Sequence, residues 1–233
     1  QDAGNDITTG IRNTIIGGRA GDSLTDADYN VALGTDALSG DTLGSKSVAI
    51  GVDALATQNF TAATDVFNIA IGFQTAAYLS TGIQNTIMGG LAGNALTGGG
   101  FSGDTRQVGA DYNVAVGYDA LGGDTLGNRS VAIGRRALYT QNFTSATDAY
   151  NVAIGFEAGD QVTTGIQNTF VGGLAGAFAT TADTSTFIGH KAGQGISGTK
   201  LTGNDNTAVG KDAGLLLQGA ATQNTFLGST AGD

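Results

Sequence analysis

The chain has 233 residues, of which 40 are glycine and none is proline or cysteine, and its formal net charge is −10. Glycine without a three-residue period excludes collagen, and the lack of cysteine excludes a disulfide framework and a thiolate metal site. The acidity disfavours binding to nucleic acid, so we expect no nucleic-acid partner. No apolar stretch approaches the length of a membrane span, about 20 residues, so we expect no direct membrane insertion.

A short phrase recurs from one end of the chain to the other. It consists of Asn or Ser, three residues that include β-favouring types, Gly, two variable residues and Ala. The copies open at Asn13, Asn30, Ser47, Asn68, Asn85, Asn113, Ser130, Asn151, Asn168, Ser185, Asn206 and Asn224. Self-similarity at steps of 17 to 21 residues, with one longer step, is typical of a solenoid. Proline cannot donate to a β-ladder, so its absence suits a backbone that is laddered throughout.

Each copy alternates in the manner of a β-strand. In the phrase 47–51, Val48 and Ile50 share one face, while Ser47 and Ala49 share the other. We expect stacked coils to bury the Val and Ile side chains as a continuous apolar seam. These features predict an all-β fold, namely a single elongated parallel β-solenoid (β-roll) of about twelve coils.

Two positions of the phrase carry structural predictions. Glycine stands fifth in every copy, which predicts a positive φ or a neighbouring backbone too close for a Cβ atom. The opening Asn predicts side chains that hydrogen-bond along the long axis or cap a local turn.

The third position of the phrase divides the copies into two classes. It is bulky at Ile15, Ile87, Phe170, Phe187 and Phe226, and it is alanine at Ala32, Ala49, Ala70, Ala115, Ala132, Ala153 and Ala208. A face of repeated alanines allows close approach of another chain, so these seven alanines are predicted to form a subunit interface. The alternative is that they form a second internal core face.

Several consecutive coils together form a longer repeat in the sequence. Residues 28–73 align with residues 111–156 at a constant offset of 83. We therefore predict one repeat domain over residues 1–233, with four-coil blocks at about 13–84, 85–167 and 168–233.

The one long step between copies, from Asn85 to Asn113, contains an insertion at about 98–108. Its residues Phe101, Asp104 and Arg106 are predicted to contact a receptor. The alternative is a tolerated loop without a role.

The sequence shows little that predicts catalysis or a cofactor. His190 is the only histidine and lies at a variable position, and no nucleophile elbow, zinc-protease or phosphate-loop motif is present. We therefore expect no enzyme and no cofactor. Bound calcium is a lesser possibility at the acidic residues Asp22, Asp26, Asp28, Asp104 and Asp111.

One enzyme class stays open as an alternative. A polysaccharide-cleaving β-helix would need a carboxylate cluster along one face. Aspartate recurs at the second variable position of the phrase, at Asp36, Asp53, Asp119 and Asp212. Aspartate is also a common turn residue, so the regular spacing is equally typical of a turn that recurs in each coil.

The phrase Ser47-Val48-Ala49-Ile50-Gly51 resembles the head repeat of trimeric autotransporter adhesins, which are parallel β-rolls of three chains. The form Asn206-Thr207-Ala208-Val209-Gly210 is similar to repeats of bacteriophage tail fibres. The coils of this chain are longer than those of the adhesin heads.

This resemblance implies a homotrimer at an extracellular or virion surface. It implies a non-enzymatic structural and adhesive segment, phage tail-fibre-like, that presents loops to a host-surface glycan or protein. The alternatives are a bacterial trimeric adhesin head and an extracellular surface filament that assembles end to end from copies of itself.

Overall fold

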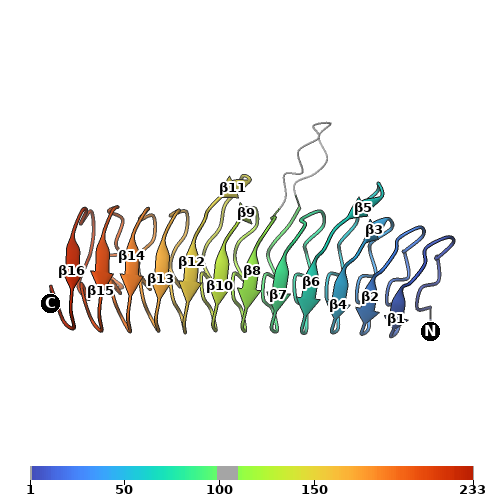
Figure 1. Cartoon of the computed structure of the whole chain (residues 1–233), viewed down its shortest axis with the longest axis horizontal. Helices are drawn as coiled ribbons and strands as arrows, with labels where there is room; N and C mark the ends of the chain where they lie inside the picture. Colours follow the sequence, from blue (N-terminus) through green and yellow to red (C-terminus); the bar gives the residue numbers. More distant parts are fainter. Residues whose placement is uncertain (1, 99–109, 233) are drawn as a thin grey trace.

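The computed structural model describes residues 2–98 and 110–232. Over these residues the chain is all-β, with no helix and therefore no helix that could cross a membrane. It winds as a single parallel β-solenoid of about eleven turns. Figure 1 shows the coils stacked side by side into a rod, with the two ends of the chain at opposite ends of the rod. The predicted fold class is confirmed, whereas the single chain says nothing about the number of copies.

One twelve-stranded parallel sheet runs along the rod, and each coil contributes one three-residue strand to it. The strands are β1 (Thr14–Ile16), β2 (Val31–Leu33), β4 (Val48–Ile50), β6 (Ile69–Ile71), β7 (Thr86–Met88), β8 (Val114–Val116), β10 (Val131–Ile133), β12 (Val152–Ile154), β13 (Thr169–Val171), β14 (Thr186–Ile188), β15 (Thr207–Val209) and β16 (Thr225–Leu227). Equivalent positions of neighbouring copies pair throughout, for example Ala115 with Ala132. The repeat in the sequence is therefore also the register of the sheet.

Two smaller parallel sheets lie outside the main one. They pair β3 (Gly44–Ser45) with β5 (Thr64–Asp65), and β9 (Gly127–Asn128) with β11 (Thr147–Asp148). Both project from the same edge of the rod, as Figure 1 shows. They recur at the 83-residue offset that relates the two aligned segments of the sequence.

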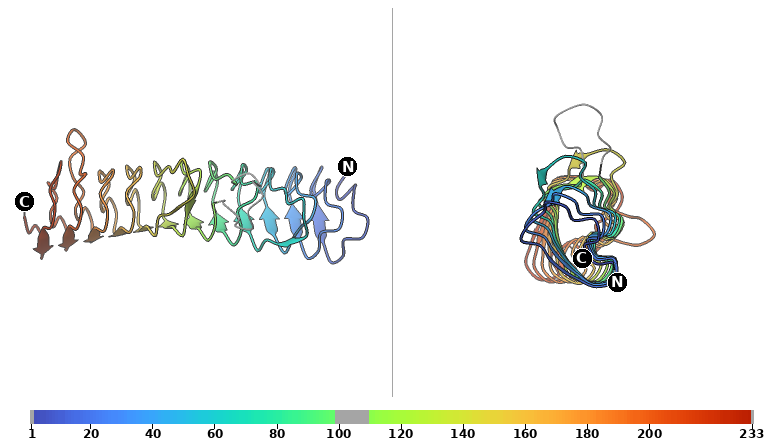
Figure 2. Two further views of the ribbon diagram at one scale, coloured as in Figure 1. Left: turned by 90° about the horizontal axis from the view of Figure 1, so that it is seen from above. Right: turned by 90° about the vertical axis from the view of Figure 1, so that its right-hand side faces the viewer.

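The third position of the phrase points into the solenoid. The alanines of this inner row, and the bulky residues Ile87, Phe170 and Phe187, are at most 1% exposed in the single chain. The prediction that the Val and Ile positions form the buried seam was wrong, because none of those side chains is buried in the strands. In the end-on view of Figure 2 the coils lie one behind another around a common interior, and the inner row is the buried one.

The opening asparagines form a ladder inside the rod, which confirms that prediction. Asn113 Oδ1 accepts a hydrogen bond from the backbone N–H of Ser130, at 2.9 Å, one coil further along. Its Nδ2 donates to the carbonyl of Gly127 at 2.9 Å. Because Asn113 is fully buried, each of these bonds satisfies a backbone group that water cannot reach.

The fifth-position glycine is required for both predicted reasons. Gly134 has φ +131°, and a Cβ atom there would lie 2.3 Å from the carbonyl oxygen of Gly155 in the next coil. The same close approach recurs along the rod, as between Gly17 and Gly34, where the distance would be 2.5 Å. The glycines thus let the backbones of adjacent coils meet at one corner.

The size of the inner-row side chain is matched by the residue six positions later. Where the inner row is bulky, that residue is glycine, as in Phe187 with Gly193 and Ile87 with Gly93. Where the inner row is alanine, it is leucine in four of the seven copies, the fully buried Leu38, Leu55, Leu121 and Leu138, and it is Ala76, Gly159 or Gly214 in the other three. The two classes of copy are therefore two ways to fill the same volume.

Candidate interaction surface

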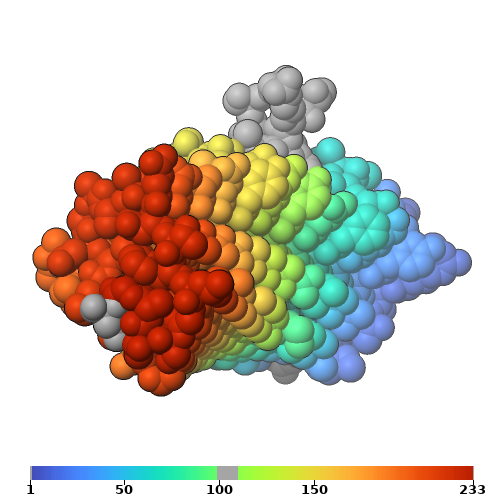
Figure 3. Space-filling view, turned by 60° about the vertical axis from the view of Figure 1, so that its left-hand side comes forward, coloured from blue at the N-terminus to red at the C-terminus, as the bar shows by residue number. Residues whose placement is uncertain are grey.

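The outward side of the twelve-stranded sheet is here called the strand face. It carries two rows of side chains, one from the first and one from the third residue of each strand. The first row is Thr14, Val31, Val48, Ile69, Thr86, Val114, Val131, Val152, Thr169, Thr186, Thr207 and Thr225, and the second is Ile16, Leu33, Ile50, Ile71, Met88, Val116, Ile133, Ile154, Val171, Ile188, Val209 and Leu227. Neither row contains a charged residue. Side chains of successive coils line up in rows along the rod in Figure 3.

Two further rows flank the strand face, and both carry exposed aromatic residues in every second coil over part of their length. The Tyr112 row consists of the residue before each opening Asn or Ser and includes Tyr29, Phe67, Tyr112 and Tyr150. The Tyr118 row consists of the residue after each fifth-position glycine and includes Phe73, Tyr118, Phe156 and His190. The seven Tyr and Phe side chains named here are between 43% and 56% exposed.

Cations stand between the aromatic rings of the Tyr112 row. The Arg129 guanidinium lies 5.0 Å from the centroid of the Tyr112 ring and 5.7 Å from that of Tyr150, so it is placed between them. Lys46 lies 5.1 Å from the centroid of Phe67. These contacts are cation–π interactions, which hold neighbouring coils in register. The same cations form ion pairs, Lys46 with Asp65 and Arg129 with Asp148.

The strand face and its flanking rows hold most of the exposed large apolar side chains of the described chain. All but three of its exposed large apolar side chains belong to these four rows, and the three exceptions are Ile11, Tyr78 and Leu216. A monomeric protein rarely exposes a contiguous apolar patch larger than a few hundred Å², and larger patches mark interaction sites. This surface is therefore the best candidate for a functional site.

The predicted subunit interface does not lie here. Ala32, Ala49, Ala70, Ala115, Ala132, Ala153 and Ala208 are all 0% exposed in the single chain. They cannot contact a second chain without opening the solenoid, so the interface prediction was wrong and the alternative, an internal core face, holds. The alternation of the strand was read correctly, but its inward and outward faces were exchanged.

The other predicted residues are distributed as follows. Phe101, Asp104 and Arg106 lie outside the described residues. His190 is exposed in the Tyr118 row. Of the residues suggested for calcium, Asp26 accepts a hydrogen bond from Thr9 at 2.5 Å, and Asp28 accepts one from the backbone of Ile11 at 2.7 Å. In the part of the chain that the structure describes, no three acidic or histidine side chains gather as metal ligands would.

The recurring aspartates belong to a strained turn. Asp36, Asp53, Asp119 and Asp212 all have φ of 55° or 56°, in the left-handed region. The same position in other coils is taken by Arg19, Gln74 and Leu91, also with positive φ. A row of such mixed chemistry does not present a series of converging carboxylates. Its regularity reflects a turn that aspartate tolerates better than most residues.

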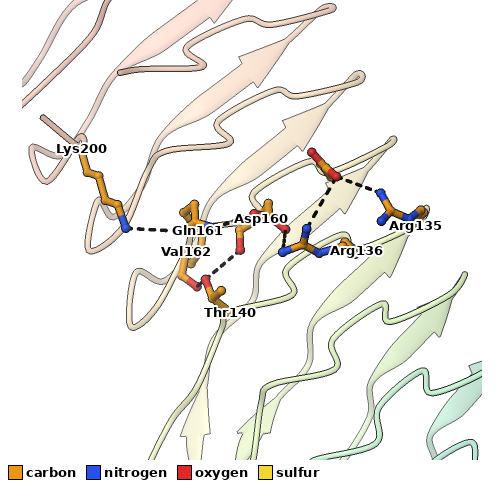
Figure 4. Close-up of polar contacts among 8 residues, drawn as sticks. Arg135, Arg136, Thr140, Asp160, Gln161, Val162 and Lys200 are labelled. Atoms are coloured by element: carbon orange, nitrogen blue, oxygen red, sulfur yellow. Dashed lines mark hydrogen bonds and ion pairs between the residues drawn. The ribbon is translucent and has the colours of Figure 1, made fainter. Parts of the chain in front are cut away.

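A charged cluster links two adjacent coils, those opened by Ser130 and Asn151, and Figure 4 shows its contacts. Arg135 donates to Glu157 at 2.9 Å, and Arg136 lies 3.1 Å from Asp160 Oδ1 in an ion pair. Burial raises the pKa of the Asp160 carboxyl, against the opposing effect of its hydrogen bond from Gln161. Both carboxylates are thus paired with arginine, an arrangement that ties coils together rather than one that leaves an acid and a base free.

Sequence reasoning missed the strand face, although a signal was present. In the alternating phrase, the two outward positions hold Val, Ile, Leu, Met or Thr in every copy. Aromatic residues then recur on both sides of the phrase in alternate coils. A solvent-facing row of an ordinary solenoid would be expected to carry charged residues in many copies. The absence of any charge on either face of the strand was the signal of an interaction surface.

Comparison of the chain with protein-family models, with curated proteins and with solved structures returned no match. The architecture that the structure itself establishes is a parallel β-solenoid with an exposed apolar strand face.

Proposed function

We propose that this chain is a non-enzymatic structural and adhesive segment, phage tail-fibre-like, which works as a rigid rod in an assembly of several copies at an extracellular or virion surface. The observation that carries the proposal is the uninterrupted twelve-stranded parallel sheet, in which each coil pairs only with its neighbours. At about 4.8 Å per coil the rod is roughly 55 Å long. The length of such a rod is set by its number of repeats.

We assign attachment to loops on one edge of the rod. The turns at residues 61–63 and 144–146 are exposed and belong to the two small sheets that project from the same edge (Figure 1). They are spaced four coils apart by the duplication. The insertion at 98–108, with the predicted receptor residues Phe101, Asp104 and Arg106, falls between them in the sequence.

The attachment role is tested by binding of the labelled chain to a panel of host-surface glycans and intact cells. One variant replaces residues 61–63 and 144–146 with Gly-Ser-Gly and deletes residues 98–108. We expect binding by the wild-type chain and its loss in this variant, with the folded spectrum retained. A matched control replaces the turn at 196–199, which projects from a different side of the rod (Figure 2), and should bind normally. Equal binding by all three chains would reduce the proposed role to that of a spacer.

A further inference from the structure

The two rows of the strand face form an apolar surface that a single chain leaves in water. Twenty-four side chains, none of them charged, cover it from β1 to β16. Valine and isoleucine in such numbers on a solvent face have an unfavourable free energy of hydration, which grows with the apolar area exposed. Burial against a partner removes that cost.

The dimensions of this surface suit a stable protein interface. Twelve coils give a length of roughly 55 Å, and three extended residues give the strand face a width of about 10 Å, so its area is about 550 Å² before the two flanking rows add to it. A standard interface buries about 800 Å² on each partner. The largest apolar patch of an ordinary monomer is about 300–600 Å².

The chemistry of the rows indicates the kind of partner. The centre is aliphatic apart from its threonines, and a second β-sheet packs on such a surface at about 10 Å between sheets. The aromatic rings of the Tyr112 row have cations against their faces, as Arg129 has between Tyr112 and Tyr150, so those faces are not open platforms for stacking a sugar. A protein sheet therefore fits this surface better than a polysaccharide does.

A second copy of the chain carries a sheet with the same spacing. Its rows repeat at the coil-to-coil distance, so side chains can interdigitate along the whole rod without slipping out of phase. Aromatic residues of the two flanking rows fall in the same coils, Phe67 with Phe73 and Tyr112 with Tyr118, where they would line the rim. We infer that the strand face of one copy is covered by the strand face of another, with the aliphatic rows at the centre of the interface.

This inference rests on the proposed function in one respect, namely that the segment works as an assembly of copies. It differs from that function because it assigns the contact to particular side chains. The rows also differ along the rod: the first row is mainly valine from β2 to β12 and threonine from β13 to β16. The contact should therefore be strongest over residues 29–156.

The test is the absolute mass in solution by light scattering, over a range of concentrations, for the wild-type chain and for the triple variant V114T, V131T, V152T. Threonine already occupies this row in six coils, so the solenoid tolerates it. We expect the wild type to be a multiple of 23.1 kDa. The triple variant should assemble at least tenfold more weakly, with an unchanged circular dichroism spectrum. A control variant, Y78T with L216T, alters exposed apolar residues outside the four rows and should keep the wild-type mass.

Two results would overturn the inference. If the wild type is assembled and the triple variant has the same affinity, the copies meet elsewhere, and the fibre function would stand with a different interface. If the wild type is a monomer at every concentration, copies do not cover the strand face, which would then be open to another class of partner, such as a polysaccharide. Loop-dependent attachment in the binding assay would be unaffected by either result.

Discussion

The ring of Phe187 fills the space that a side chain at position 193 would need. A Cβ atom on Gly193 would lie 2.5 Å from three atoms of that ring. Gly193 also has φ +52°, a conformation that glycine adopts without strain. One coil further towards the N-terminus, Phe170 and Gly176 have the same relationship, and the two rings stack with centroids 5.3 Å apart. In these coils the ring at the inner-row position fills the core, and the position six residues later is left as glycine.

This relationship predicts that core residues can be exchanged only in pairs. A115I adds volume to a filled core, and L121G leaves a cavity, so each single change should lower the free energy of unfolding by about 2–4 kcal/mol. The double variant reproduces the Ile87–Gly93 pair of the neighbouring coil and should recover at least about 1 kcal/mol relative to the sum. Urea denaturation of the four chains measures this coupling. Strict additivity would contradict the pairing.

The fifth-position glycine should be irreplaceable where backbones meet. G134A places a Cβ atom 2.3 Å from the Gly155 oxygen in a residue with φ +131°, and we expect a loss of about 3 kcal/mol or more in the free energy of unfolding. At Gly173 the nearest atom to an added Cβ would be 3.6 Å away and φ is not positive, so G173A should change stability by less than about 0.5 kcal/mol. Thermal unfolding of both variants checks the difference, and equal effects would show that the close approach is not what demands glycine.

The asparagine ladder should contribute to stability through buried backbone groups. N113A leaves the N–H of Ser130 and the carbonyl of Gly127 without partners in a fully buried site, at a cost of about 2–5 kcal/mol. N224A removes side-chain hydrogen bonds at a half-buried position that water can reach, and should cost less than half as much. Chemical denaturation compares them. A cost for N113A no greater than that for N224A would mean that the ladder is not the main support of the stack.

Two buried aspartates predict a pH dependence of folding. Asp41 accepts hydrogen bonds from the backbone of Phe60 at 2.9 Å and from Gln58 at 2.6 Å, and Asp124 is held in the same way by Phe143 and Gln141. Burial raises the pKa of both carboxyls in spite of these bonds. The folded state therefore holds a proton at pH values where the unfolded chain has lost it.

The sign of the effect follows from that difference. The stability that these groups contribute is fully present below the ordinary carboxyl pKa and is lost as the pH rises through the raised value. The free energy of unfolding should fall from mildly acidic to neutral pH, and the double variant D41N, D124N should show a smaller slope. Denaturant titrations across that range measure the slope for both chains. An unchanged slope in the variant would assign the dependence to other carboxyls.

The strand phrase shows how far the sequence alone determined this protein. The repeat period, the asparagine ladder and the need for glycine are local and recur in every copy, so one chain displays each of them about twelve times. They determine an all-β solenoid and its register, because equivalent residues of identical coils pair with one another.

The direction of each face was decided only by the tertiary structure. Alternation places Val114 and Val116 on one face and Asn113 and Ala115 on the other, and hydrophobicity favours the valine face as the inner one, whereas the structure buries Asn113 and Ala115. The closed coil decides it, because Ala115 and Leu121 of the same coil are both fully buried in one core cluster, where Leu121 supplies the volume. For the same reason valine and isoleucine lie outward. The sequence carried the signal of an uncharged surface, but only the folded coil decided which side of the strand it occupies.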